Sequence, residues 1–325
     1  MEVKVAHESW PIRGSFAISR GSRTTAEVLL VTLQEGGCIG RGEAVPYARY
    51  GETLEESQAE VEALAVDLPA GLERAALAER LQAGAARNAL DCALWDLEAK
   101  RSRRPAWQLA GLEQPKAVTT AFTLSLDSPE KMAAAAAENA WRPLLKLKLA
   151  GPGDLDRVAG VRAAAPKSKL IVDANEGWDL EAYRDLAPRL AELGVSLVEQ
   201  PLHADADEAL RGEERPLPLC ADESCHDRAT LDRLIGLYDC VNIKLDKAGG
   251  LTEALAMKAA AKEAGLQIFV GCMLATSLAM APAVLLAQGA EYVDLDGPLL
   301  LDKDRRPGLT IEGSKMQPPV SALWG

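Results

Sequence analysis

Apolar and polar residues alternate differently in two regions of the chain. Over residues 1–112, short stretches with every second residue apolar predict β-strands, and Gly36-Gly37 predicts a tight turn between two of them. Apolar residues three and four positions apart then predict helices, the first after a Thr53–Glu56 pair typical of a helix N-terminus. We therefore expect an α+β domain. Its predicted strands span 2–10, 26–34 and 38–41, and its predicted helices span 54–68 and 85–100.

In the second region, short apolar segments alternate with helices rich in alanine and leucine. This order favours an α/β fold, a parallel (β/α) TIM-type barrel of seven or eight strands over residues 113–300. An open doubly wound sheet is the alternative, but it usually has a glycine-rich turn after its first strand, and residues 118–130 contain no glycine. The predicted strands span 118–124, 144–149, 169–173, 196–199, 217–221, 240–244, 267–271 and 291–296.

A charged residue stands at the end of each of five consecutive predicted strands. The intervals between these residues are 22 to 26 positions, which is one strand–helix unit each time. Because the carboxyl ends of parallel strands surround one mouth of a barrel, we expect these side chains to converge there. The five residues are Lys148, Asp173, Glu199, Asp222 and Lys244.

The three acidic residues of this set predict a metal site. Three carboxylates on adjacent strands would repel one another in a mouth of low dielectric, and a divalent cation removes that repulsion. Ligation by oxygen alone suits a hard ion such as Mg²⁺, whereas softer ions favour histidine or cysteine. We therefore predict Mg²⁺ at Asp173, Glu199 and Asp222, against the alternative of three unrelated solvated carboxylates.

Two lysines share one face of the second barrel strand, because the two-residue period of a strand puts Lys146 and Lys148 on the same side. Burial lowers the pKa of an ammonium group and a like-charged neighbour lowers it further, which would allow a lysine to act as a base near neutral pH. We assign that role to Lys148, nearer the mouth, and the adjustment of its pKa to Lys146. The alternative is a lysine pair bound to carboxylates for structure alone.

Lys244 ends the sixth strand, which lies opposite the second strand in a ring of eight. A substrate on the barrel axis would then have Lys148 on one side and Lys244 on the other. Two such bases suit removal of a proton from one face of a carbon and its return to the other face, while Mg²⁺ stabilises the enediolate formed beside a carboxylate. The predicted reaction is a 1,1-proton transfer, that is, racemisation or epimerisation.

The net charge of the chain indicates which classes of binding partner to expect. Acidic residues number 48 against 36 basic ones, and a net charge of −12 argues against nucleic acid or an anionic membrane surface. No apolar run is long enough to span a bilayer, and residues 1–10 lack the apolar core of a signal peptide. The six cysteines show no Cys-x-x-Cys spacing. We expect a cytoplasmic protein with a small-molecule substrate.

These motifs resemble those of the enolase superfamily, in particular its muconate-lactonizing-enzyme subgroup. The resemblance implies Mg²⁺ at the three acidic residues and acid/base roles for Lys148 and Lys244. It also implies that residues 301–325 return to the capping domain of residues 1–112, and that the chain forms a homo-oligomer. The matching stretches are Lys146-Leu147-Lys148, Asp173-Ala174-Asn175, Glu199-Gln200-Pro201, Asp222-Glu223-Ser224 and Asn242-Ile243-Lys244 before Gly249-Gly250.

Two further stretches resemble the dipeptide epimerases of that subgroup, especially those acting on L-Ala-D/L-Glu. The eighth strand ends with Asp294 and Asp296, a carboxylate pair that in such enzymes holds the free α-ammonium of the dipeptide, as charge-assisted hydrogen bonding allows. The alternative for Asp294 is an acid in a surface turn. The seventh strand ends with Cys272 and Met273, which the resemblance places beside the substrate.

Loops of the capping domain are expected to complete the pocket. In epimerases of this kind a cap-loop arginine meets the glutamyl side chain, and Arg20 and Arg23 are equal candidates here, with solvated loop cations as the alternative. The segment Val45–Thr53 is either a second loop that closes over the substrate and excludes water or a plain connection.

Three other hypotheses remain. The chain could catalyse another reaction of the same subgroup, as an N-acylamino acid racemase, an o-succinylbenzoate synthase or a cycloisomerase, in which case a substrate without an ammonium group leaves Asp294 and Asp296 without a partner. It could be a metal-free aldolase with a Schiff-base lysine. It could be a non-catalytic binding barrel, although five buried charges argue against that.

Overall fold

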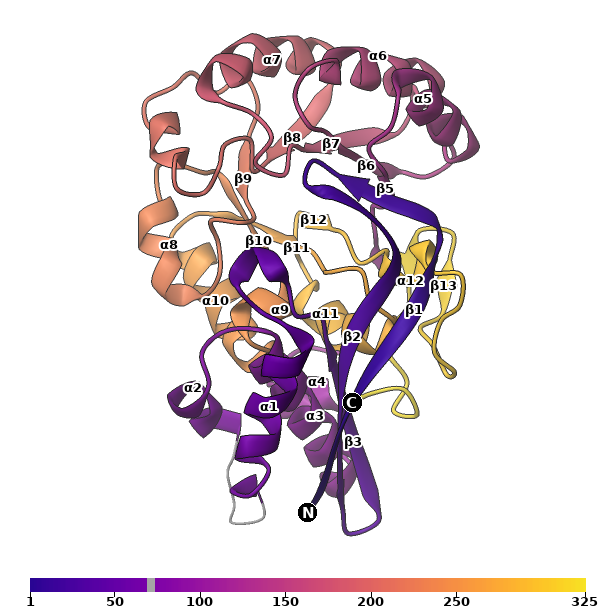
Figure 1. Ribbon diagram of the computed structural model, residues 1–325, viewed down its shortest axis with the longest axis vertical. Coiled ribbons are helices and arrows are strands. Elements are labelled where there is room, and N and C mark those ends of the chain that lie inside the picture. Colours follow the sequence, from indigo (N-terminus) through magenta and orange to yellow (C-terminus); the bar gives the residue numbers. More distant parts are fainter. Residues whose placement is uncertain (69–73) are drawn as a thin grey trace.

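The computed structural model describes residues 1–68 and 74–325, and a three-stranded antiparallel sheet opens the chain (Figure 1). The sheet joins β1 (Glu2–Ile18), β2 (Gly21–Glu35) and β3 (Cys38–Ala44) in that order. The predicted turn at Gly36-Gly37 is confirmed, since both residues have positive φ. The helical segments of this region are η1 (Ala48–Tyr50), α1 (Leu54–Leu64), η3 (Arg74–Ala76), α2 (Leu77–Arg80), α3 (Ala85–Ser102) and α4 (Ala106–Leu109).

Helix α1 begins where the sequence predicts it. The Thr53 hydroxyl accepts a hydrogen bond from the Glu56 amide at 3.1 Å, so Thr53 caps the helix, and it donates to the Glu56 carboxylate at 2.9 Å in place of the backbone contact of a full capping box. Helix α3 packs closely on β3 because Gly42 lacks a side chain: a Cβ atom there would lie 2.0 Å from the carbonyl oxygen of Ala89.

The second part is the predicted parallel barrel, which is confirmed (Figure 1). Its eight strands lie in the order β12 to β5, and the Ala121 amide donates to the Val293 carbonyl at 2.7 Å, which joins the two ends of the sheet. The strands are β5 (Phe122–Leu124), β6 (Leu144–Lys148), β7 (Lys169–Asp173), β8 (Val195–Glu199), β9 (Leu219–Ala221), β10 (Cys240–Ile243), β11 (Gln267–Val270) and β12 (Tyr292–Val293).

Helices cover the outside of this ring and bury its outward-facing side chains. They are α5 (Pro129–Glu138), α6 (Asp154–Ala164), α7 (Leu180–Glu192), α8 (Arg228–Leu234), α10 (Leu251–Glu263) and α11 (Ser277–Leu286). The short segments η4 (Asp207–Leu210), α9 (Leu245–Ala248) and α12 (Gly297–Leu300) come after β8, β10 and β12.

Inside the barrel, an apolar cluster fills the space below the mouth. It includes Leu144, Ile171, Leu197 and Cys220, each of which stands two residues before a charged residue on the same strand. Because side chains two positions apart point to the same face, the charged residues continue these inward rows toward the mouth. The fold therefore brings them together on top of a packed apolar floor.

The first predicted barrel strand is shorter than expected. We expect one strand over 118–124, but the structure divides it into β4 (Val118–Thr119) and β5. The reason is a partner distant in sequence: β4 pairs with β14 (Lys315–Met316), which pairs with β13 (Ile311–Glu312) in a small antiparallel sheet.

The C-terminal segment contacts the capping region. The Trp324 side chain is buried, and its indole N–H donates to the carbonyl oxygen of Cys92 in α3 at 2.9 Å. The Gly325 amide donates to Asp96 at 2.8 Å. Domain boundaries at 112 and 300 stay a prediction. Among the described residues, no helix is both long and apolar enough to cross a membrane.

Candidate active site

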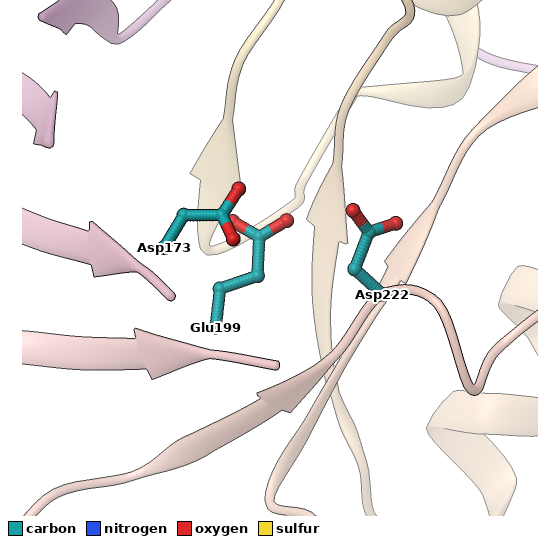
Figure 2. A group of neighbouring side chains, drawn as sticks. All are labelled: Asp173, Glu199 and Asp222. Carbon is teal, nitrogen blue, oxygen red and sulfur yellow. The ribbon is translucent and has the colours of Figure 1, made fainter. Parts of the chain in front are cut away.

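Three buried carboxylates from adjacent strand ends face one another at the mouth of the barrel (Figure 2). Asp173 ends β7, Glu199 ends β8 and Asp222 follows β9. One oxygen of each lies within 4.8 Å of one oxygen of the others. The sequence-predicted metal residues are thus gathered at one point, where their charges need a cation.

Each carboxylate has one oxygen held by the surrounding scaffold. For Asp173 the donor is the Asn175 amide at 2.9 Å, for Glu199 it is the side-chain amide of Asn242 at 2.7 Å, and for Asp222 it is Lys247 Nζ at 2.5 Å. The other oxygen of each carboxylate therefore faces the mouth.

Lysines meet these inner oxygens. Lys148 Nζ lies 2.6 Å from Asp173 Oδ2, and Lys244 Nζ lies 2.6 Å from Asp222 Oδ2. Lys146 Nζ lies 2.7 Å from Glu199 Oε2 and 3.2 Å from Asp173 Oδ2. All three lysines are buried, and Lys148 and Lys244 stand on strands four places apart in the order of eight.

The site fits a hard cation. Its donors are carboxylate oxygens, the type that Mg²⁺ prefers. Two more buried oxygens beside the triad, Asn175 Oδ1 and Glu223 Oε2, have no hydrogen-bond donor among the described residues. Burial and the charge of Asp173 raise the pKa of Glu199 to about 8, although Lys146 opposes this, which is the expected effect of crowding buried carboxylates.

The lysines hold the two aspartates ionised. Burial raises the pKa of Asp173, but the charges of Lys148 and Lys146 outweigh it and lower that pKa to about 2. Burial likewise raises the pKa of Asp222, yet Lys244 and Lys247 lower it well below its usual range. These ion pairs are strong because the site is buried.

For Lys146 the expected direction of the pKa shift is wrong, and the pKa of Lys244 is raised as well. Burial lowers the pKa of Lys146, as predicted, but Asp294 and Glu199 more than reverse this and raise it well above 10.5. Burial lowers the pKa of Lys244 too, and Asp222 raises it beyond the usual value. Desolvation and neighbouring lysines alone would lower these pKa values, but the carboxylates that share the mouth raise them.

The Asp294 and Asp296 carboxylates enter the same mouth from the end of β12. Asp294 Oδ2 lies 3.0 Å from Lys146 Nζ, and Asp296 Oδ2 accepts a hydrogen bond from the Thr123 amide at 2.6 Å. Burial and the charge of Asp294 raise the pKa of Asp296 to about 7. Among the described residues, Lys146 is the one cationic group in an ion pair with either acid.

Cys272 and Met273 follow β11, next to β12. Met273 is buried, and burial with the charges of Asp294 and Asp296 raises the pKa of the Cys272 thiol well above 9.0. Cys272 is therefore a neutral thiol beside the carboxylate pair.

The two arginines at the turn between β1 and β2, which we call the first cap loop, have different surroundings: Arg20 lies in the turn and Arg23 at the start of β2. Arg20 donates to Glu223 Oε1 at 2.7 Å, to the Asn175 carbonyl at 2.9 Å, and to Glu176 Oε2 and the Tyr47 hydroxyl at 3.1 Å. The Arg23 guanidinium lies 5.9 Å from the centroid of the Tyr47 ring, and no ion pair or side-chain hydrogen bond engages it within the described parts of the chain. Arg20 is thus bound to the barrel.

The second cap loop, Val45–Thr53, contacts the barrel through Arg49. Arg49 donates to both carboxylate oxygens of Glu176, at 2.8 and 2.7 Å, and Glu176 follows β7. Glu176 has a backbone φ of 65°, a conformation that residues other than glycine rarely adopt. Both cap loops therefore reach the barrel at Glu176, a residue that the sequence argument missed.

Sequence reasoning also missed Glu223, Arg49 and Lys247. Glu223 directly follows Asp222, and Lys247 stands three residues after Lys244, about one helical turn. These spacings could have indicated from the sequence that Glu223 and Lys247 lie near the site. Arg49 gave none, because its partner is 127 positions away.

Comparison with known proteins identifies the family. A domain model described as enolase C-terminal domain-like matches residues 130–321, and one described as the N-terminal domain of mandelate racemase/muconate lactonizing enzyme matches residues 1–111. The chain belongs to the mandelate racemase/muconate lactonizing enzyme family of the enolase superfamily. The resemblance predicted from the motifs is confirmed.

Several relatives are similar along nearly their whole length. The L-Ala-D/L-Glu epimerase of Escherichia coli (strain K12) is 47% identical over 309 residues, which cover 94% of this chain and 96% of that protein. An N-acetyl-D-glutamate racemase of a Pseudoalteromonas species is 45% identical over 300 residues, 92% of this chain and 95% of that one.

Two similar crystal structures each contain a metal ion and a dipeptide. An enolase family member from Agrobacterium tumefaciens with homology to dipeptide epimerases, holding sodium and L-Ala-L-Glu, has a TM-score of 0.98 and 52% identity, covering 99% of both chains. A dipeptide epimerase from Cytophaga hutchinsonii, complexed with Mg and D-Ala-L-Val, has a TM-score of 0.89 and 27% identity, covering 98% of this chain and 92% of that one.

Proposed function

We propose that the chain is a Mg²⁺-dependent dipeptide epimerase that interconverts L-Ala-D-Glu and L-Ala-L-Glu. One observation carries this proposal: two buried lysines, Lys148 and Lys244, stand on opposite strands of the barrel and flank a carboxylate triad. Neither a binding module nor a Schiff-base aldolase requires such a pair. The similarity to an L-Ala-D/L-Glu epimerase along both chains supports the same substrate.

Asp173, Glu199 and Asp222 would hold the metal ion through the oxygens that face the mouth. When bound, Mg²⁺ would stabilise the negative charge that develops on the substrate carboxylate as its α-proton leaves. The chain's own contribution is to fix these oxygens on three rigid strand ends above a packed floor.

The two lysines divide the proton transfer between them. Once Asp173 and Asp222 hold a metal ion, the ion pairs that keep Lys148 and Lys244 as ammonium groups would weaken. One lysine, as the neutral amine, would then take the α-proton from one face of the glutamyl Cα, and the other, as the ammonium, would return a proton to the opposite face. Running the reaction in reverse exchanges their roles. Lys146, bound to Glu199, Asp173 and Asp294, stays protonated and offsets part of the charge around the intermediate.

Asp294 and Asp296 would bind the α-ammonium of the alanyl residue. Burial and the charge of Asp294 raise the pKa of Asp296 to about 7, and a cationic ligand would offset the repulsion between the two carboxylates. The neighbouring Cys272 and Met273 would line the pocket beside the alanyl residue.

Arg23 would meet the glutamyl side-chain carboxylate. Its guanidinium is half-buried beside Tyr47 and is free of protein carboxylates within the described residues, whereas Arg20 is committed to Glu223 and Glu176. A charged hydrogen bond of this kind selects an acidic second residue. Arg20 instead holds the cap loop on the barrel.

Racemisation of an N-acyl glutamate is the second candidate function, because an N-acetyl-D-glutamate racemase is 45% identical to the chain. Such a substrate has no ammonium group, so it would use Arg23 and the lysines but would leave Asp294 and Asp296 without a cation.

A screen tests the proposal directly. The purified protein is incubated with Mg²⁺ in deuterated water with a library of dipeptides and N-acylamino acids, and deuterium uptake is read by mass spectrometry. The proposal predicts uptake at the second residue of Ala-Glu dipeptides. Uptake confined to N-acylamino acids would favour the second candidate, and uptake by neither would refute both.

We also infer a cytoplasmic location, from the sequence, and a homo-oligomer, which the resemblance to this subgroup implies. Sedimentation velocity of the purified protein tests the second inference, and a single boundary at the mass of one chain would contradict it.

A further inference from the structure

Lys247 is a buried lysine that the proposed proton transfer does not use. Its side chain is fully enclosed, and it lies in α9, one helical turn after Lys244. All three of its N–H bonds have acceptors: Nζ lies 2.5 Å from both Asp222 Oδ1 and the Asp222 carbonyl oxygen, and 3.0 Å from the Asn242 carbonyl oxygen. A lysine held in this way joins the ends of β9 and β10.

The partner of Asp222 differs from those of the other two carboxylates. The scaffold oxygen of Asp173 is held by a backbone amide, and that of Glu199 by the side-chain amide of Asn242. Both donors are neutral. Of the three carboxylates, Asp222 alone has its scaffold oxygen held by a full positive charge. Its strand, β9, is also the shortest of the three, with three residues against five in β7 and in β8.

The two oxygens of Asp222 are therefore divided between two lysines. Lys247 holds Oδ1 on the side of the scaffold, while Lys244 meets Oδ2 on the side of the mouth. Without Lys247 the carboxylate could rotate about its Cβ–Cγ bond, and Lys244 would be the one remaining cation to orient it.

We propose that Lys247 is a positioning residue that fixes the Asp222 carboxylate so that Oδ2 alone is presented to the metal ion. This inference rests on the proposed function, because it presumes that the triad binds a divalent cation. Partners that orient a metal-ligating carboxylate typically contribute about 10- to 100-fold in metal affinity. Lys247 should therefore be visible in metal binding itself, apart from any turnover.

The chain offers a matched control in Lys258. This half-buried lysine also donates to two backbone carbonyls, those of Leu286 and Gln288 at 2.6 and 2.5 Å, but it contacts no carboxylate of the mouth. Lys258→Met thus removes a similar set of hydrogen bonds without touching Asp222.

The test is the binding of Mn²⁺ alone, measured by electron paramagnetic resonance of the free ion, with circular dichroism and melting temperature recorded for each variant. Lys247→Met should weaken Mn²⁺ binding by about 10- to 100-fold. Lys247→Gln, which keeps two N–H donors and folds more easily, should weaken it less, and Lys258→Met should leave it unchanged.

The outcomes separate this inference from the proposed function. Wild-type affinity for Mn²⁺ in folded Lys247→Gln and Lys247→Met, or equal weakening in Lys258→Met, would overturn the role of Lys247 while leaving the metal site intact. Failure of the wild-type protein to bind Mn²⁺ would overturn the metal site and this inference together.

Discussion

Lys148 donates from Nζ to Oδ2 of Asp173 across 2.6 Å, so a proposed base and a proposed metal ligand share one oxygen atom. Lys244 and Asp222 make the same contact on the other side of the triad. A metal ion and two lysines therefore compete for the inner oxygens of one small site. Acid/base chemistry and metal binding are coupled by this geometry.

Removal of one carboxylate should abolish metal-dependent turnover. Asp173→Asn keeps the shape of the side chain but removes the charge that a cation and Lys148 both use. We expect epimerisation to fall at least about 100-fold at Mg²⁺ concentrations that saturate the wild type, because metal stabilisation of developing charge is worth several kcal/mol. Turnover by the wild-type protein after extensive chelation would contradict the metal assignment.

The two cap-loop arginines should differ in what they affect. Arg23→Ala should lower kcat/KM for Ala-Glu by about 10- to 100-fold, the loss expected for a charged hydrogen bond, and should leave dipeptides with an apolar second residue nearly unchanged. Kinetics over a short dipeptide series provides the measurement.

Arg20→Ala should instead lower kcat/KM for every dipeptide, because it releases the first cap loop from Glu223 and Glu176. A selective loss for acidic second residues in Arg20→Ala, with no such loss in Arg23→Ala, would show that the two roles are assigned the wrong way round.

Asp296 separates the two candidate functions. Asp296→Asn should lower kcat/KM for Ala-Glu by about tenfold or more, because the α-ammonium loses one charged acceptor. It should have little effect on exchange of the α-proton of N-acetyl-glutamate, which lacks that ammonium. If the variant treats both substrates alike, the carboxylate pair has another role.

A buried acid between the capping region and the barrel should make stability depend on pH. Asp91 in α3 accepts from the Thr252 amide at 3.0 Å, and burial raises its pKa from 3.8 to about 6. The folded protein thus binds this proton more tightly than the unfolded chain does. The resulting stabilisation is complete below about pH 4 and is lost as the pH rises through about 6, a change of about 3 kcal/mol.

Urea denaturation of wild type and Asp91→Asn between pH 4 and pH 7 measures this effect. As the pH rises, the wild type should lose about 3 kcal/mol of unfolding free energy relative to Asp91→Asn, whose amide does not titrate. A difference that stays constant with pH would show that the Asp91 pKa is not raised.

The positions of charged residues at the ends of parallel strands, together with the two-residue period of each strand, were enough to place the centre of the site. Leu144, Lys146 and Lys148 lie in one inward row, and the same rule places Glu199 above Leu197. Such rows depend on local geometry alone, so a single sequence reveals them.

Contacts between distant segments could not be predicted in this way. The pairing of Val118 with Met316 splits a predicted strand, and the partners of Arg20 lie more than 150 positions away at Asn175 and Glu223. The raised pKa of Lys244 has the same origin, since its direction depends on the distance to Asp222.

Stereospecific exchange of the α-proton tests the two-base arrangement most directly. Lys148→Ala and Lys244→Ala are each incubated with Mg²⁺ and either L-Ala-D-Glu or L-Ala-L-Glu in deuterated water, and the glutamyl Cα is followed by proton NMR. Epimerisation should fall by about 100- to 10,000-fold in both variants. Each variant should still exchange the α-proton of one epimer, and that epimer should differ between the two. Loss of exchange from both epimers in either variant, with dipeptide binding intact, would contradict the assignment of one lysine to each face.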